Sequence, residues 1–432
     1  PDYMQPEATP HRSPVRRTTI IGLSLLAVAF AAAVIYDSSP PDVSEFLPES
    51  PPVADSENGF LLLQDVIAEF KNRPDEERTK ILELAKPGST EWDAPLAEKI
   101  LTDDKTALEA LSGALEKPSW YHGKIDDTPN FSLIPDLVKL KKIAAVHAFE
   151  SADRQLGIQH LRDLHTTADS ISNANLAAIG ELLQITIEAE ITATIARIIP
   201  TLADHDLLKS IHELITANPP DRTSWRRGLH SEFLYFRKML EPHGRQGSGL
   251  SIDGEFTILD SLAYKPNITL NKILAIYHES ASNTEAPDFA ARTTTLLEQV
   301  SEPPTGWRKY INLNSTGDEI AREASGSVHT VELKTWLPQV YHTQALLLVA
   351  LQRYQLDHGN QLPASLSGLV PTYLSSLPSD PYNNSALNYD PERRLVWSVG
   401  QNLTDDGGHH DPEASRLDAD NPTIHIPLPT TQ

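Results

Sequence analysis

The sequence contains no cysteine, which excludes several kinds of chemistry. Disulfide bonds, thiolate zinc sites and a cysteine nucleophile are all ruled out. Positive charge is also scarce, because 36 Lys and Arg residues stand against 59 Asp and Glu residues, for a net charge of −23. Binding to a phosphate backbone needs clustered Lys and Arg side chains, so we expect no nucleic-acid partner.

One apolar run without charge covers residues 18–36 (TTIIGLSLLAVAFAAAVIY). As a helix it would span about 28 Å, which is close to the thickness of the hydrocarbon core of a bilayer. Arginines precede the run and acidic residues follow it, at Arg12, Arg16, Arg17, Asp37, Asp42, Glu45 and Glu49. Since positive flanks stay cytoplasmic, the pattern predicts a single-pass inner-membrane protein with its carboxy-terminal bulk in the periplasm.

A second interpretation of this run is a cleaved secretory signal. Ala31 and Ala33 offer a small-residue cleavage site, and the body would then be secreted. The pair Arg16-Arg17 also resembles part of a twin-arginine export signal, although its neighbours fit that signal poorly. We therefore favour ordinary positive-inside arginines over an export signal, and we expect a retained anchor.

Composition divides the chain into five parts. Residues 1–17 are polar and predict a disordered cytoplasmic tail, 18–36 the transmembrane helix, and 37–56 an extended, proline-rich acidic linker. Residues 57–330 predict an irregular α-helical extracytoplasmic domain, and 331–432 a small α+β module with an acidic tail. The fold class expected is therefore mainly α, and no fixed-length repeat supports a solenoid.

Apolar periodicity predicts the individual helices. We expect them at 59–70, 75–85, 94–116, 133–167, 174–199, 203–217, 222–240, 268–281, 286–300 and 331–358. The clearest is 174–199, where Leu and Ile recur every three or four residues. Pro338 either kinks the last helix or marks its first turn. Two short strands are expected at 387–389 and 395–398, followed by a loop tail over 403–432.

The stretch 341–408 resembles the carboxy-terminal domain of the major pseudopilin of type II secretion systems. The resemblance rests on a helix, a hairpin and three ordered motifs, which are Tyr354–Asp357–Gly359, Leu377-Pro378 with Asp380-Pro381-Tyr382, and Ser398–Gly400 with Asp405-Asp406-Gly407-Gly408. It implies a small α+β fold. The whole chain is similar to bacterial membrane-anchored envelope proteins that have no known activity.

The chain also departs from pilin-type subunits. No acidic residue lies inside the apolar run after Arg17, where such subunits carry a Glu. Nearly three hundred residues separate the apolar run from the pseudopilin-like helix, whereas a polymerising pilin has one continuous helix. We therefore expect a pseudopilin-like module reused at the end of a larger anchored protein.

The resemblance implies a calcium ion in the final loop. Calcium takes six to eight oxygen ligands, and the motif positions give Asn402, Asp405, Asp406 and Asp411 as candidates. Asn402-Leu403 stands where the family usually has Asp-Gly, which removes one carboxylate and one flexible residue. The alternative is a capped Asp-Gly turn without metal.

Other polar groups have a structural interpretation that we favour. His160, Asp163 and His165 are expected on a wet helix face, and Glu181, Glu188 and Glu190 on the exposed face of the 174–199 helix rather than in acid–base chemistry. Trp225-Arg226-Arg227 and Trp307-Arg308-Lys309 predict a cation stacked on a ring. His409-His410 are expected to be exposed tail residues rather than metal ligands.

No catalytic residue or organic cofactor site is predicted. The sequence lacks H-E-x-x-H, G-x-S-x-G and phosphate-loop motifs. We expect a binding or assembly protein of the bacterial envelope, linked to a type II secretion-like system, whose partners are other envelope proteins. The alternative is an envelope hydrolase or lyase with an active site assembled from distant residues of the helical domain. A subunit of a secretion-like filament is a third hypothesis.

Overall fold

The computed structural model describes residues 24–25, 36–44, 53–71, 73–85, 92–120, 134–174, 176–240, 264–301, 314–409 and 421–428. The predicted tail at 1–17 and almost all of the predicted transmembrane helix at 18–36 lie outside these ranges. Within them, no helix combines the length and the apolar character needed to cross a bilayer. The transmembrane helix therefore stays a prediction.

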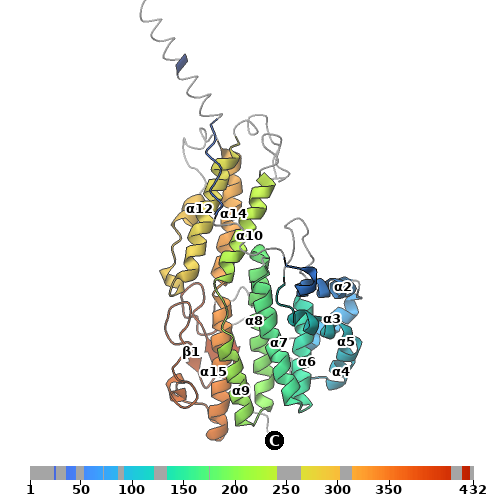
Figure 1. Ribbon diagram of the computed structural model, residues 1–432. Coiled ribbons are helices and arrows are strands. Elements are labelled where there is room, and N and C mark those ends of the chain that lie inside the picture. Colours follow the sequence, from blue (N-terminus) through green and yellow to red (C-terminus); the bar gives the residue numbers. More distant parts are fainter. Residues whose placement is uncertain are drawn as a thin grey trace, which may run out of the picture.

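The protein is mainly helical, as its sequence predicts, and carries one small sheet (Figure 1). The first group of helices is α2 (Gly59–Lys71), α3 (Asp75–Ala85), α4 (Ala94–Asp103), α5 (Lys105–Leu115), α6 (Ile134–Glu150) and α7 (Arg154–Ser172). The second is α8 (Ala177–Ile198), α9 (His205–Ala217), α10 (Ser224–Leu240), α12 (Pro266–Ser282), α13 (Thr295–Ser301), α14 (Ser315–Lys334) and α15 (Leu337–Asp357).

Three predicted helices are each divided in the structure. The 94–116 helix breaks between α4 and α5 at Asp104, whose carboxylate pairs with Arg73. The 133–167 helix ends after α6, and Asp153 then caps α7 by accepting a hydrogen bond from the Leu156 amide at 3.1 Å. The predicted 331–358 helix is divided between the end of α14 at Lys334 and the start of α15 at Leu337. Pro338 lies in the first turn of α15, where a helix needs no hydrogen bond from its N–H, so it starts a helix and does not kink one.

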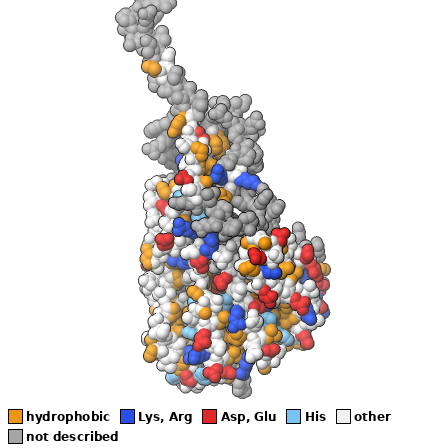
Figure 2. Space-filling view, viewed as in Figure 1, with side chains coloured by type: hydrophobic (Ala, Val, Ile, Leu, Met, Phe, Trp, Pro, Cys, Tyr) orange, Lys and Arg blue, Asp and Glu red, His pale blue; other side chains and the backbone are white. Residues whose placement is uncertain are grey.

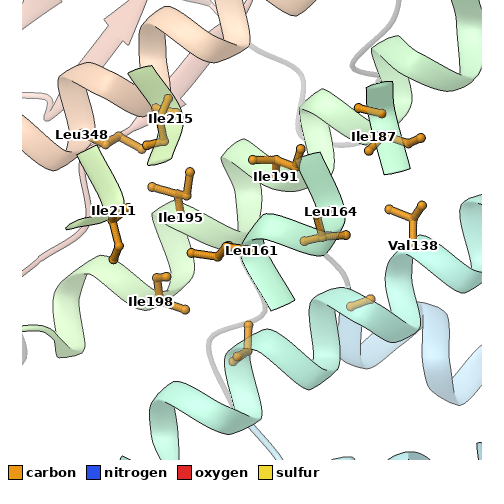
Figure 3. Close-up of a cluster of buried hydrophobic side chains, with 14 of the residues drawn as sticks. Val138, Leu161, Leu164, Ile187, Ile191, Ile195, Ile198, Ile211, Ile215 and Leu348 are labelled. Carbon is orange, nitrogen blue, oxygen red and sulfur yellow. The ribbon is translucent and has the colours of Figure 1, made fainter. Parts of the chain in front are cut away.

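Helix α8 lies at the centre of the molecule. It packs against α6, α7, α10, α14 and α15, and no residue from 181 to 199 is exposed. Figure 3 shows its isoleucines among apolar side chains of the surrounding helices. The labelled set is Val138, Leu161, Leu164, Ile187, Ile191, Ile195, Ile198, Ile211, Ile215 and Leu348. Apolar contact on every side explains why this helix is so rich in Ile.

A second apolar core joins α10, α12 and α14, above α8 in Figure 1. Below it, a buried polar network fixes the ends of these helices. Glu332 of α14 accepts hydrogen bonds from Ser280 of α12, from Asn283 at 2.9 Å and from Arg292 at 3.2 Å. The Trp225 indole of α10 in turn donates to the Ser280 hydroxyl at 2.9 Å. Each polar group in this network is thereby satisfied without water.

The sheet has the order β1 (Asn388–Asp390), β2 (Leu395–Trp397) and β3 (Thr423–His425), all antiparallel. The two predicted strands are confirmed by β1 and β2. The prediction of a loop throughout 403–432 is wrong at β3, where Ile424 pairs with Val396. This strand is only three residues long and has prolines close on either side, so its sequence shows no alternation.

The carboxy-terminal module expected at 331–432 and the helical domain share one core. Val396 and Ile426 belong to the same apolar cluster as residues of α2 to α9 and α15. The Thr192 hydroxyl of α8 donates to the Tyr341 carbonyl of α15 at 3.0 Å. The expected division between residues 330 and 331 falls inside α14.

The start of the predicted linker contacts the body. The Asp37 carboxylate accepts hydrogen bonds from the amides of Asn267 and Ile268, both at 3.0 Å, at the start of α12. Helix α12 has no side-chain cap of its own at Lys265. The segment 36–44 runs along the upper end of α12 in Figure 1, and Val43 packs against the second core.

Charges of both signs are interspersed on the face seen in Figure 2. Several lie on adjacent turns of one helix, such as Lys80 with Glu76 at 3.0 Å. Exposed pairs of this kind contribute well under about 1 kcal/mol each, so they keep the surface soluble rather than hold the fold.

The first prediction concerns the cap on α12. Asp37→Ala should lower the free energy of unfolding by about 1 kcal/mol, because two amides at a helix start lose their acceptor. It should also speed hydrogen exchange in the first turn of α12. Asp42→Ala is the matched control, since Asp42 is exposed and accepts hydrogen bonds from Ser44, two residues away in its own segment. Equal effects of the two variants would show that the contact of Asp37 with α12 is unimportant.

Candidate functional site

A small polar cavity lies where the end of α7 meets the starts of α8 and α10. Its lining residues are Ile171, Ser172, Leu176, Gly180, Glu181, Ser224, Arg227 and Gly228. They come from three helices that are up to about fifty residues apart in sequence. A site of this kind is what the hypothesis of distant catalytic residues requires.

Glu181 and Ser224 form the centre of this site. Glu181 is 4% exposed, and its Oε2 lies 2.8 Å from the Ser224 hydroxyl oxygen. That hydroxyl also lies 3.0 Å from Gln184 Oε1 and 2.7 Å from the Asp221 carbonyl oxygen. A hydroxyl has one proton to donate, so three oxygen neighbours are best served when one of them donates in return. A protonated Glu181 does this.

Burial favours that protonated form. Loss of water raises the pKa of Glu181 to about 7, with the hydrogen bond from Ser224 acting in the opposite direction. Arg227 lies nearby and donates to Asp221 Oδ2 at 3.0 Å and to the Ser172 carbonyl at the end of α7 at 3.3 Å. A cation at that end of α7 also faces the negative end of the helix dipole.

The free volume of this cavity limits the size of any ligand. About 10 Å³ is free, which is room for one water molecule. A water there would meet a carboxyl, a hydroxyl and a guanidinium group. The site is therefore suited to a buried water and too small for an organic substrate.

The other two glutamates of α8 point elsewhere. Glu188 is 3% exposed, and burial, followed by the charge of Asp169, raises its pKa to about 8. Glu190 accepts a hydrogen bond from Lys142 at 2.7 Å. The expectation that Glu181, Glu188 and Glu190 share an exposed face is wrong, because α8 has neighbours on every side.

The prediction that His160, Asp163 and His165 lie on a solvent-exposed face of α7 is also wrong. Asp163 forms a salt bridge with the buried Lys141 of α6. His165 is buried, and the loss of water lowers its pKa to about 4, as it does for His160. These histidines are neutral at physiological pH. Throughout the described residues, no group of three or more His, Asp or Glu could hold a metal ion.

The aromatic–basic pairs are arranged differently from the prediction. Trp225 is buried in the second core, and Arg226 lies 3.6 Å from Glu285. A guanidinium does stack on an indole elsewhere, since Arg222 lies 3.4 Å above the Trp336 ring. Sequence reasoning missed this pair because 114 residues separate its members. The second predicted pair, at 307–309, lies outside the described residues.

The predicted calcium ligands are only partly brought together. Asn402 Nδ2 donates to Asp406 Oδ2 at 3.1 Å. Asp405 turns away, and its Oδ1 accepts from the Trp397 indole at 2.8 Å. Asp411 and His410 lie outside the described residues, and His409 is exposed. Calcium binding by this set stays a prediction.

One motif carboxylate has a clear positioning role. Asp380 is buried and accepts hydrogen bonds from the Ser398 hydroxyl at 2.8 Å, the Val399 amide at 2.9 Å and the Tyr382 amide at 3.0 Å. It ties the Asp380-Pro381-Tyr382 turn to the end of β2. The ordered motifs in the sequence pointed to Asp380, Tyr382 and Ser398 as important residues. No sequence motif pointed to Asn421, which contacts the loop that follows Ser398.

The second prediction concerns the buried carboxyl of Glu188. Its folded pKa of about 8 lies above the ordinary value of 4.5, so the stability it contributes is complete below pH 4.5 and is lost as pH rises toward 8. Glu188→Gln should therefore be increasingly more stable than the wild type above pH 5, by on the order of 1 kcal/mol per pH unit. Urea unfolding at a series of pH values measures the difference.

The buried histidines also make stability depend on pH, but their contribution is the same in the wild type and in Glu188→Gln, so it cancels in the difference. Glu213→Gln on α9 is the control, since Glu213 is exposed and should show no pH-dependent difference. A flat difference for Glu188→Gln would mean that Glu188 ionises normally in the folded protein.

Comparison with known proteins gives no relative for this chain. No protein-family model matches it, and neither does any curated protein or solved structure. The resemblance of 341–408 to the major pseudopilin therefore stays a prediction, as does the similarity to envelope proteins.

Proposed function

We propose that the protein is a membrane-anchored binding or assembly protein of the bacterial envelope. In this proposal residues 18–36 hold it in the inner membrane, and the body lies in the periplasm and contacts other envelope proteins. Its link to a type II secretion-like system rests on the resemblance of the carboxy-terminal module. Nucleic acid is not among the proposed partners, given the net charge of −23.

The observation that carries the proposal is the contact between Asp37 and α12. The apolar run ends at Tyr36, and the next residue accepts two hydrogen bonds from the start of α12. An anchor at 18–36 would therefore hold the upper end of the α10, α12 and α14 bundle directly at the lipid surface. A body attached in this way has a fixed orientation, which suits an assembly protein better than a freely diffusing enzyme.

The same arrangement points the pseudopilin-like module away from the anchor. In Figure 1 the sheet and the end of α15 lie in the lower half of the molecule, opposite the start of α12. Leu403 and Leu428 of this module are 43% and 72% exposed. Two exposed large apolar side chains in one small module offer contact area for a partner.

The hydrolase or lyase hypothesis finds one favourable observation. Glu181 of α8 meets Ser224 and Arg227 of α10, and the pKa of Glu181 is raised to about 7. The free space of about 10 Å³ decides against it, because a substrate would have to displace packed helices. The assembly role is therefore the better supported of the two.

The third prediction tests topology and partner binding together. A periplasm-dependent reporter fused after Gln432 should be active, and the protein should remain in the membrane fraction after salt washing. A photo-crosslinking residue at Leu403 should capture a defined envelope protein in intact cells. The same probe at exposed Leu156, on α7, is the control and should capture nothing specific. A reporter active only in the cytosol would contradict the proposal, and so would identical capture from both positions.

A further inference from the structure

A buried amide closes the loop that the sequence predicted to hold calcium. We propose that the N–H groups of the Asn421 side chain contact the loop oxygens in place of a cation, so that residues 398–409 keep their fold without a bound metal ion. The proposal concerns the loop alone and does not depend on the anchor or on the partners.

Asn421 contacts three separate positions of the loop. It is 1% exposed and lies just before β3. Its Nδ2 donates to the carbonyl oxygens of Val399 and Thr404, each at 2.9 Å. Its Oδ1 accepts from the Asp406 amide at 2.8 Å. Both N–H donors of the amide are thus used on backbone carbonyls, which are the kind of oxygen that calcium binds.

Three further oxygens of the loop also meet nitrogen donors. Asp405 Oδ1 accepts from the Trp397 indole, and Asp406 Oδ2 from the Asn402 side-chain amide. The Arg393 guanidinium donates to the Gly407 carbonyl at 2.8 Å. With the two N–H groups of Asn421, a permanent cation and four neutral N–H groups point their positive ends at oxygens of this loop.

These contacts do not fit calcium binding. A calcium ion takes six to eight oxygens, and it would be repelled by N–H groups directed at the same atoms. Asn421 would have to leave the loop and expose two buried carbonyls.

The position of Asn421 is fixed before any ligand arrives. The Pro422 carbonyl accepts from the Ser398 amide at 3.1 Å and from Gln344 Nε2 of α15 at 2.8 Å. The Thr423 hydroxyl donates to the Asn421 carbonyl at 2.8 Å. The amide is therefore held in place by its own backbone, as a bound ion would be held by its ligands.

The fourth prediction is that calcium leaves the wild-type protein unchanged. Thermal unfolding of the full chain in detergent should give the same Tm in millimolar CaCl2 and in excess EGTA. Hydrogen exchange of peptides covering 398–409 should also be the same in both. A higher Tm or stronger protection of this loop in CaCl2 would overturn the proposal.

A matched pair of variants tests Asn421 itself, in EGTA. Asn421→Asp keeps the size of the side chain but places a carboxylate against two carbonyls, so Tm should fall by several degrees and protection of 398–409 should be lost. Asn384→Asp makes the same chemical change at an exposed position of the same module, outside the loop, and should leave Tm nearly unchanged. Equal effects of the two variants would overturn the role of Asn421. The wild-type comparison decides the metal question even if Asn421→Asp fails to fold.

Discussion

The enclosure of α8 on all sides is the constraint on which the rest of the structure depends. Five other helices pack around it, and its apolar side chains contribute to two of the three cores, with Ile187 and Ile191 in one and Ile185 in another. Enclosure also sets the chemistry of its polar side chains. Burial raises the pKa of Glu181 and of Glu188 and favours their protonated forms, whereas Glu190 accepts a hydrogen bond from Lys142.

Packing against α8 also makes the carboxy-terminal module part of the body rather than an appendage. Helix α15 lies directly on α8, and Phe289, from the segment before α13, makes edge-to-face contacts with Trp336 and with Tyr382 of the module. Arg292 covers the Phe289 ring and reaches Glu332. A module held by apolar rings and a buried ion pair has a fixed position relative to the helices.

The sequence was sufficient to predict the mainly helical class, most helix positions and two of three strands, because these follow from local periodicity and turn residues. Periodicity describes one face of a helix, so it could not reveal that α8 has no exposed face, and it placed Glu181 and Glu188 in solvent. The contacts of Asp37 with α12, Arg222 with Trp336 and Asn421 with Val399 are made by residues brought together only by folding. No local pattern marks such partners.

The two protonated glutamates alter the charge that the protein presents. The formal value of −23 counts every Asp and Glu as ionised. A pKa of about 8 leaves Glu188 mostly neutral at pH 7, and a pKa of about 7 leaves Glu181 neutral about half of the time. At these two positions the folded chain is therefore less anionic than the unfolded chain at the same pH, and each of the two carboxyls releases protons to the solvent on unfolding near neutrality.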